Sequence, residues 1–288
     1  MKPQIHPATD IGLVSLKIKH LERSISFYTE VIGLKLLKRE ERRAEMTADG
    51  MKPLVILHEI DDALVLPERS GAGLYHFAIL VPNRASLGLV VRNLIRNNIP
   101  VGQGDHTVSE ALYLSDPDNN GIELYADRPR DTWKRDSTGH YVMGTDPVDV
   151  EGLLAVSDHM QWTGLPAGTV IGHVHFHVSN LQDAEQFYVN LLGFDITARY
   201  GSMALFISAG GYHHHIGLNT WAGEGAPPVP ENAAGIDYFT LRLPDQTALD
   251  EVVTRLTESG YSLTQRAGGL FVKDPFNIGI RLEVKSNG

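Results

Sequence analysis

The chain has 288 residues, of which 42% are apolar and 21% are charged, a length and composition that allow two globular domains with separate cores. A formal net charge of −10 without a block of Lys or Arg argues against a nucleic-acid partner, and the absence of cysteine excludes disulfides, thiolate metal sites and cysteine nucleophiles. Since no apolar run approaches the roughly 20 residues of a membrane span, and the N-terminus shows no secretory signal, we expect no membrane partner and a cytoplasmic location.

The first predicted strand belongs to a segment that occurs twice. Residues 11–33 begin with an apolar strand pattern and end in a Phe-Tyr pair and a glycine, and the same order returns without a gap 160 residues later, at residues 171–193. Internal repeats of this kind indicate duplicated structural units. The copies differ at a position where chemistry can lie, because Leu13 of the first copy is His173 in the second.

A second repeated pair follows each of these copies. The strand pattern around His76 is followed by an amphipathic helix whose apolar residues lie three and four positions apart, and the strand pattern around Tyr238 is followed by a helix of the same kind. Both segments then reach an Asp-Pro turn, at Asp116 and at Asp274, before one more strand.

The sequence therefore predicts four units, each made of a strand, a helix and about three further strands. The units cover residues 8–68, 72–128, 168–222 and 234–285. We expect an N-terminal domain over residues 1–128 and a C-terminal domain over residues 168–288. Residues 129–167 are interpreted as the connector, in which residues 148–156 show a short helical pattern.

The four units resemble the βαβββ modules of the vicinal oxygen chelate superfamily, in its two-repeat type. The resemblance covers nearly the whole chain and includes the Phe-Tyr pair near the end of each odd helix and the glycine step after it. It is closest to the catechol 2,3-dioxygenase-like extradiol dioxygenases among the glyoxalase-fold proteins. It implies an α+β fold in which two modules curl into a half-barrel, with metal ligands on the inner face from the first and last strands of each module.

This resemblance places the candidate metal ligands. The first-strand positions are Leu13, His76, His173 and Tyr238, and the last-strand positions are Glu123, Gly217 and Arg281, with the last strand of the first unit expected near residues 64–66. Only His76, Glu123 and His173 can hold a divalent metal. Two His and one carboxylate form the facial triad of non-haem Fe(II) oxygenases and also suit Mn(II).

The superfamily pairs its modules in two ways, either 1 with 2 and 3 with 4, or 2 with 3 and 1 with 4. Only the second arrangement unites His76, Glu123 and His173, and it leaves the 1+4 pair without a ligand set. We therefore expect the 2+3 and 1+4 pairing.

Further His residues accompany the triad. His173, His175 and His177 alternate with apolar residues and so share one face of a strand. We assign His175 to the substrate pocket, together with Trp221, which precedes a Pro-rich loop that would cap a substrate.

Three consecutive His occupy positions 213–215. If they lie on a strand, His214 points away from its two neighbours, and the three cannot bind one ion. The segment resembles the His-x-(Val/Ile)-x-Leu segment of extradiol dioxygenases, and this resemblance gives His214 an acid–base role. The segment before Glu123 resembles the one in which a His and a Tyr contact substrate and oxygen, which gives His106 and Tyr113 as further catalytic residues.

The resemblance implies a metal-dependent extradiol dioxygenase of aromatic catabolism, acting with O2 on a small aromatic diol and possessing Fe(II). We favour a simple or alkyl catechol, because no single Arg stands out as a partner for a substrate carboxylate. The superfamily also includes Zn(II) or Ni(II) isomerases and lyases of the glyoxalase type, three-ligand thiol transferases and metal-free drug-binding proteins. Gly217 at the fourth ligand position argues against an isomerase or lyase. The length of four units argues against a thiol transferase, and the presence of the triad argues against a metal-free binding protein. Relatives often assemble as homo-oligomers.

Overall fold

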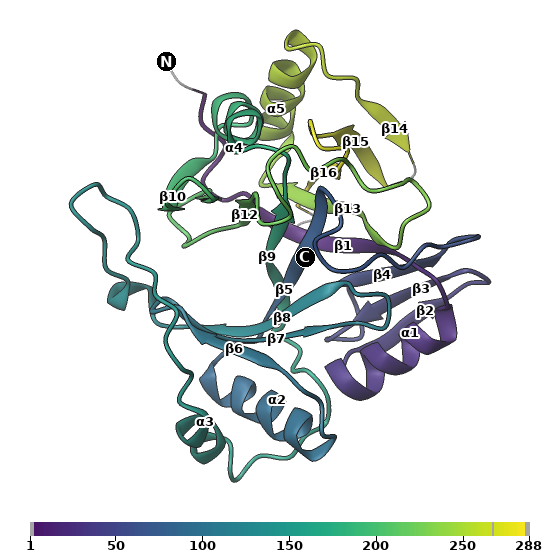
Figure 1. Ribbon diagram of the computed structural model, residues 1–288, viewed down its shortest axis with the longest axis vertical. Coiled ribbons are helices and arrows are strands. Elements are labelled where there is room, and N and C mark those ends of the chain that lie inside the picture. Colours follow the sequence, from purple (N-terminus) through teal and green to yellow (C-terminus); the bar gives the residue numbers. More distant parts are fainter. Residues whose placement is uncertain (1–2, 267, 286–288) are drawn as a thin grey trace.

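The computed structural model describes residues 3–266 and 268–285, and it shows two curled sheets with helices outside them (Figure 1). Each unit begins with a strand and a helix. The elements of units one and two are β1 (Asp10–Ile18), α1 (Leu21–Phe27), the π-helical turn η1 (Tyr28–Ile32), β2 (Lys35–Arg39), β3 (Arg43–Thr47), β4 (Val55–Glu59), β5 (Gly73–Leu80), α2 (Arg84–Arg96), β6 (Gly102–Asp105), β7 (Ser109–Ser115) and β8 (Gly121–Asp127).

The second half of the chain repeats this order after a connector. The connector holds the 3-10 turn η2 (Arg130–Thr132) and α3 (Val150–Val156). The elements of units three and four are β9 (Val170–His177), α4 (Leu181–Ala184), the π-helical turn η3 (Glu185–Leu191), β10 (Asp195–Tyr200), β11 (Ala204–Ser208), β12 (Ile216–Asn219), β13 (Gly235–Leu243), α5 (Gln246–Glu258), β14 (Thr264–Arg266), β15 (Gly269–Lys273) and β16 (Gly279–Val284).

The strands form two eight-stranded sheets that join units from opposite halves of the chain. One sheet has the order β14-β15-β16-β13-β1-β4-β3-β2, and the other has the order β10-β11-β12-β9-β5-β8-β7-β6. Unit four therefore pairs with unit one through β13 and β1, and unit three pairs with unit two through β9 and β5. The predicted α+β fold and the 2+3 and 1+4 pairing are confirmed.

The prediction for the last strand of unit one is wrong. That strand is β4, which pairs in parallel with β1 and places Ile56 opposite Ser15. Near residues 64–66 only Leu64 makes an isolated bridge, to Ala233. The acidic and Pro-containing stretch after β4 forms a loop, because its apolar residues lack the regular alternation of a strand.

The division into domains at residues 128 and 168 stays a prediction, since each sheet draws on both halves of the chain. The outer ends of the two predicted domains, residues 1–2 and 286–288, lie outside the described residues.

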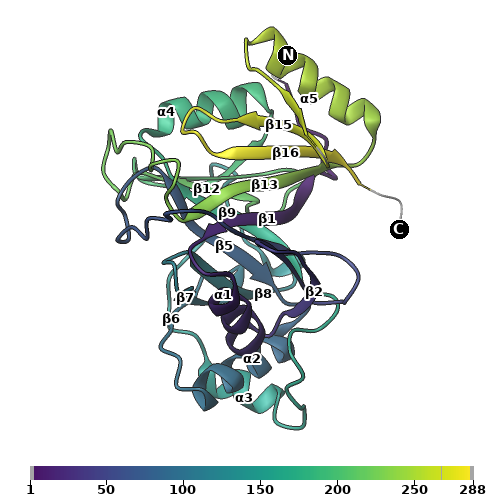
Figure 2. The same cartoon turned by 90° about the vertical axis from the view of Figure 1, so that its right-hand side faces the viewer.

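The helices, in contrast, join units within each half of the chain. In Figure 2, α1 and α2 lie together in the lower part of the molecule, and α4 and α5 lie together in the upper part. The Asn93 side chain on α2 donates to the carbonyl of Val31 in η1, at 3.1 Å. At the equivalent place, Arg255 on α5 donates to the carbonyls of Leu191 and Leu192, at 3.1 and 3.0 Å.

The repeated Phe-Tyr and Asp-Pro motifs meet in the same way twice. The Tyr28 hydroxyl donates to the Asp116 carboxyl at 3.0 Å, and the Tyr188 hydroxyl donates to the Asp274 carboxyl at 2.8 Å. All four side chains are buried. Each contact ties one sheet to the other, because unit one lies in a different sheet from unit two, and unit three in a different sheet from unit four.

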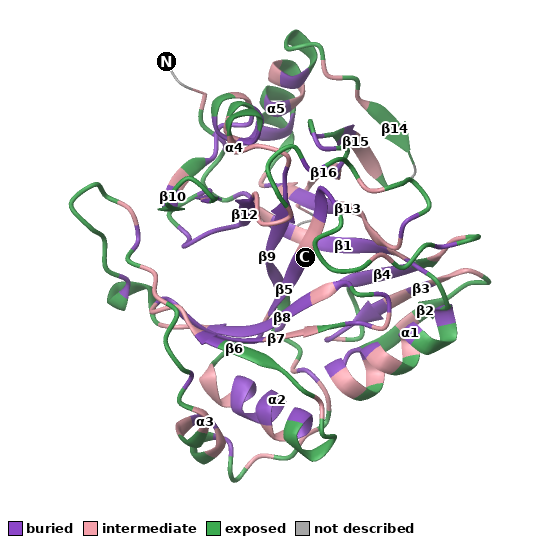
Figure 3. Cartoon of the chain, viewed as in Figure 1, coloured by how far each residue is buried: buried purple, intermediate pink, exposed green. Residues whose placement is uncertain are grey.

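The strands at the centre of the 2+3 sheet are buried along most of their length (Figure 3). Polar side chains on these strands are thus removed from water, a placement that is costly unless they are paired or bind an ion. No helix in the described ranges has the length and apolar character needed to span a membrane.

Replacing Tyr188 by Phe removes the hydroxyl that donates to buried Asp274. We expect the free energy of unfolding, measured by urea titration, to fall by about 1–3 kcal/mol, the usual cost of an unsatisfied buried polar group. Tyr28→Phe should behave alike, because it removes the repeated contact to Asp116. The control is Tyr200→Phe at a side chain that is 65% exposed. Losses no larger than that of the control would contradict this prediction.

Candidate metal centre

Three neighbouring strands bring the predicted ligands together. In the register of the sheet, Ala78 on β5 lies between Glu123 on β8 and His173 on β9. His76 precedes Ala78 by two positions on β5 and therefore points to the same face. The methyl side chain of Ala78 is completely buried and leaves space beside it for the larger side chains.

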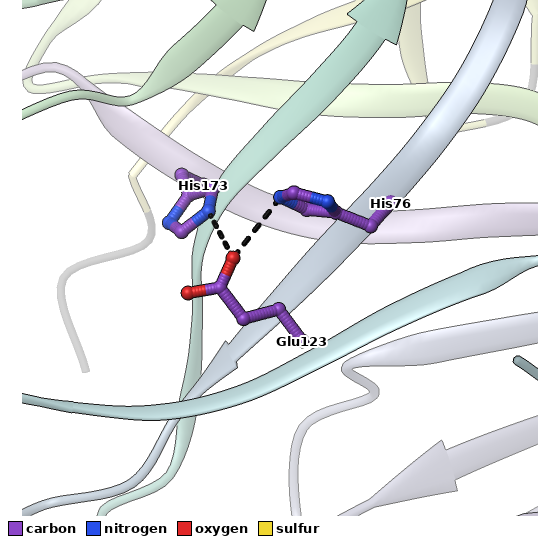
Figure 4. Close-up of side chains that lie close together, drawn as sticks. All are labelled: His76, Glu123 and His173. Atoms are coloured by element: carbon purple, nitrogen blue, oxygen red, sulfur yellow. Dashed lines mark hydrogen bonds and ion pairs between the residues drawn. The ribbon is translucent and has the colours of Figure 1, made fainter. Parts of the chain in front are cut away.

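The three side chains converge on one carboxylate oxygen (Figure 4). Glu123 Oε2 lies 3.0 Å from His76 Nε2 and 3.1 Å from His173 Nε2. One potential ligand atom from each residue lies within 4.8 Å of the other two, and all three residues are buried. In the parts of the chain that the structure describes, this is the only such group of His, Cys, Asp and Glu side chains.

The surroundings favour the protonation states that bind a metal. Burial tends to raise the pKa of Glu123, but His173 and His76 outweigh it and hold the pKa of that carboxyl well below its ordinary value. Burial lowers the pKa of the His76 imidazole. An ionised carboxylate and a neutral imidazole are the forms that bind a divalent cation.

The donor set fits a divalent metal ion. His76 Nε2 is buried and has no hydrogen-bond partner of acceptable geometry within the described ranges, although it points toward Glu123. No Lys or Arg there pairs with the Glu123 carboxylate, whose two contacting imidazoles come from His76 and His173. A buried nitrogen without a partner, next to a buried carboxylate, is the pattern expected where an ion completes the site.

The last strand of unit three provides no fourth protein ligand. The last-strand position of unit three is Gly217, opposite His175 in the register. A Cβ atom at Gly217 would lie 2.7 Å from Cγ of the His175 ring. The His175 ring thus occupies the space that a side chain at position 217 would need, so this strand contributes no fourth ligand.

The equivalent positions of the 1+4 sheet hold no ligand set. They are occupied by Leu13, Ile56, Tyr238 and Arg281. Tyr238 packs edge-on against Phe271, with ring centroids 5.0 Å apart.

His106 and Tyr113 form a pair beside the triad. Tyr113 lies opposite Glu123 in the register of β7 and β8, and its hydroxyl is 2.6 Å from His106 Nε2. His106 Nδ1 is 2.9 Å from the carbonyl of Gly144 in the connector. Because a carbonyl only accepts, Nδ1 donates and Nε2 accepts from the Tyr113 hydroxyl. Burial and the Glu123 charge raise the pKa of Tyr113 well above its ordinary value, so its hydroxyl stays protonated.

His214 lies next to the triad, but not on a strand. Residues 213–215 precede the strand, because β12 begins only at Ile216. The His214 ring is 4.1 Å from the His173 ring between centroids, and its Nδ1 is 2.8 Å from Nδ1 of His213. The glycine pair before this segment has left-handed backbone angles and forms a turn, which breaks the strand alternation.

His173, His175 and His177 share one face of β9, as alternation predicts. The Asn219 side chain connects two of them, since its Nδ2 donates to His175 Nε2 at 2.9 Å and its Oδ1 accepts from His177 Nδ1 at 2.6 Å. Trp221 donates its backbone N–H to the same oxygen at 2.9 Å. The rings of His175 and Trp221 are tilted relative to each other, with centroids 5.5 Å apart.

A cavity of about 230 Å³ opens next to the triad. Its lining includes His76, Tyr113 and His177 from the 2+3 sheet. Tyr75 also lines the cavity. Its ring centroid is 5.4 Å from that of Trp221 and 5.1 Å from that of His175, and these two predicted pocket residues lie behind Tyr75 and not in the lining.

Sequence reasoning missed two parts of this region. Glu68, at the end of unit one, and Arg69, directly after it, line the cavity although unit one belongs to the other sheet. Asp127, whose carboxylate contacts His213 at 2.9 Å, belongs to no sequence motif considered above. Its position four residues after Glu123 places it on the same face of β8, and that spacing could have found it.

The chain is similar along both halves to one superfamily. The sequence profile described as Glyoxalase/Bleomycin resistance protein/Dioxygenase superfamily matches residues 10–124 and 170–282. The chain is 57% identical to a catechol-2,3-dioxygenase of Bacillus subtilis (strain 168) over 272 residues, 94% of this chain and 95% of that protein.

Solved structures share the fold. A candidate dioxygenase from Bacillus subtilis subsp. subtilis str. 168 gives a TM-score of 0.67 at 13% identity, over 99% of this chain and 87% of that one. Glyoxalase I from Zea mays gives a TM-score of 0.57 at 16% identity, over 96% of this chain and 92% of that one. At such identities the likeness concerns the fold alone.

The geometry predicts one divalent ion per chain. After anaerobic loading with Fe(II) or Mn(II) and desalting, we expect elemental analysis to give about one ion per chain in the wild type. Glu123→Gln should weaken binding about 100-fold or more, since loss of a supporting residue alone typically costs about 10–100-fold. His159→Ala, at an exposed His, is the control. Wild-type affinity in Glu123→Gln would place the ion elsewhere.

Proposed function

Since the chain belongs to the Glyoxalase/Bleomycin resistance protein/Dioxygenase superfamily and is an extradiol dioxygenase, we propose that it opens the ring of a catechol at a metal held by His76, Glu123 and His173. The observation that supports this most directly is a buried triad next to the Tyr113–His106 pair and to His214. The named relative acts on catechol, and its 57% identity extends over nearly the whole chain.

Fe(II) is the ion that we propose, with Mn(II) as the second choice for the same donors. When bound, the ion would bring the diol and dioxygen together in its open positions and carry electron density between them.

The surrounding side chains then supply binding and proton transfer. The Tyr113 hydroxyl stays protonated and donates to His106 Nε2 at 2.6 Å, so its oxygen is available to accept a hydrogen bond from a substrate hydroxyl. Burial lowers the pKa of His214 well below its ordinary value, so its imidazole is uncharged at neutral pH and free to accept the proton of a substrate hydroxyl.

The cavity supports a small, uncharged substrate. Tyr75, Leu74 and Ile122 give it apolar walls, and about 230 Å³ is suited to a single ring with short substituents. Arg69 and Glu68 both line it, so the lining carries one positive and one negative charge. A simple or alkyl catechol therefore remains our proposed substrate. A cytoplasmic location and a homo-oligomeric assembly stay predictions.

Isomerase or lyase chemistry of the glyoxalase type is the weaker proposal. It would call for a carboxylate on the last strand of each module, and the crowding of Gly217 by His175 leaves no room for one. A metal-free binding role would leave the buried Glu123 carboxylate without a cation, which is energetically costly.

The function is tested by anaerobic loading with Fe(II) followed by catechol and air. We expect a yellow ring-fission product from the wild type and none from His76→Ala or Glu123→Gln, because each variant loses one of three ligands. Absorbance spectroscopy and mass spectrometry of the product provide the measurement. A protein with one bound ion that forms no product from catechol, methylcatechol or a carboxylated catechol would favour the isomerase or lyase.

Tyr113→Phe separates substrate handling from metal binding. We expect kcat to fall by about 10²-fold, with the ion content unchanged, because the substrate loses a positioned hydrogen-bond partner. Tyr200→Phe again serves as the exposed control. If kcat stayed within twofold of the wild type, Tyr113 would have no catalytic role.

A further inference from the structure

The candidate base His214 begins a hydrogen-bonded series of three side chains, His214, His213 and Asp127, that extends away from the metal centre. His214 Nδ1 is 2.8 Å from His213 Nδ1, and His213 Nε2 is 2.9 Å from Asp127 Oδ1. The His213 side chain is completely buried, and the Asp127 side chain is 22% exposed. The three residues come from the end of β8 and from the turn before β12, so folding of units two and three together creates the contact.

The Asp127 carboxylate, at the end of this hydrogen-bonded series, determines which ring nitrogens of His213 and His214 carry a proton. A carboxylate oxygen can only accept, so His213 Nε2 must donate to Asp127. We assign the His213 ring a single proton, on Nε2, which makes its Nδ1 an acceptor. His214 Nδ1 must then be the donor of the 2.8 Å contact, which leaves the lone pair of His214 on Nε2.

Two tyrosines hold the carboxylate in place. The Tyr212 hydroxyl donates to Asp127 Oδ1 at 3.2 Å, and the Tyr125 hydroxyl lies 2.7 Å from the Tyr212 hydroxyl. Tyr125 crosses under β9 at Gly172, where a Cβ atom would lie 1.8 Å from its hydroxyl. A glycine directly before His173 is thus required for this contact.

His213 is fixed from its other sides as well. Its backbone carbonyl accepts from the Thr197 hydroxyl at 2.6 Å, and the Trp133 ring packs against its imidazole with centroids 5.1 Å apart. Its ring has little freedom to turn away from His214, so the contact between the two imidazoles is part of the folded structure.

We propose that His213 and Asp127 are positioning residues that fix the tautomer of His214 and stabilise its charged form during ring cleavage. The inference rests on the proposed function, in which His214 accepts the substrate proton. In that step the O–H bond of the catechol breaks and an N–H bond forms at His214 Nε2. No electrons are lost or gained, and the new positive charge is balanced through His213 by the Asp127 carboxylate. A carboxylate supports a catalytic imidazole in the same manner in the Ser-His-Asp triad.

The tautomer can be measured without any activity. In metal-free protein with ¹⁵N-labelled histidine, we expect the His214 ring to carry its proton on Nδ1 in the wild type. Asp127→Asn should change this to the other tautomer or to a mixture, because an amide can donate to His213 Nε2. A wild type protonated on His214 Nε2, or an unchanged tautomer in Asp127→Asn, would overturn the proposal whether or not the protein cleaves catechol.

Kinetics test the catalytic consequence. With Fe(II)-loaded enzyme and catechol, Asp127→Asn and His213→Gln should each lower kcat about 10–10²-fold, with KM and ion content within about twofold of the wild type. Asp131→Asn, at an exposed Asp outside this chain of contacts, is the matched control.

The two variants support each other, because one keeps the imidazole and the other keeps the carboxylate. If Asp127→Asn misfolds, His213→Gln must still show the loss of kcat at constant KM. A value of kcat within twofold of the wild type in a folded variant, or a loss matched by the control, would overturn the proposal. If the wild type itself cleaves no catechol while the tautomer behaves as expected, the proposed function fails and the hydrogen-bond assignment stands.

Discussion

The antiparallel register of β5 against β9 decides where every candidate ligand lies. It places Ala78 opposite His173, and the parallel pairing with β8 places Glu123 on the other side of Ala78. A shift by one residue would turn the imidazoles to the opposite face of the sheet. This register also buries a carboxylate between two imidazoles, an arrangement that is costly unless a cation compensates it. The need for a cation thus follows from the way the strands pair.

The sequence predicted this centre because the units repeat. A side chain that can bind a metal on one strand says little, but His76 and His173 occupy the same position in two units. The last-strand position likewise contrasts Glu123 with Gly217, and the structure gives the physical reason for the glycine, which is contact with the His175 ring. The choice of the 2+3 pairing followed from asking which arrangement unites the three ligands, and the strand order confirms it.

The features that could not be predicted depend on turns and on contacts between units. The end of β4 could not be located, because the loop after it contains apolar residues without a clear period. The turn at Gly210 and Gly211 removes residues 213–215 from the strand, so that neighbouring imidazoles contact one another. Arg69 reaches the cavity only because unit one packs against unit two, and no local pattern carries that information.

The two sheets carry side chains of opposite charge at the equivalent last-strand position. Arg281 stands where the other sheet has Glu123, and its partner is Glu283 on the same strand. Tyr238 stands where the other sheet has His76, and its ring packs on Phe271, just as His76 packs near Tyr113 at 5.6 Å. Both sheets thus keep an aromatic pair at this level, while the charge beside it is reversed.

In the 1+4 sheet the Arg281 guanidinium itself supplies a positive charge at the equivalent position, and it pairs with the half-buried Glu283. In the 2+3 sheet the same position is occupied by the Glu123 carboxylate, which lies beside two imidazoles, and this difference limits the candidate metal site to one half-barrel. The helices and the repeated Tyr–Asp contacts then hold the two sheets together. The 1+4 half therefore supports the site mechanically, since both units that carry ligands are fastened to it.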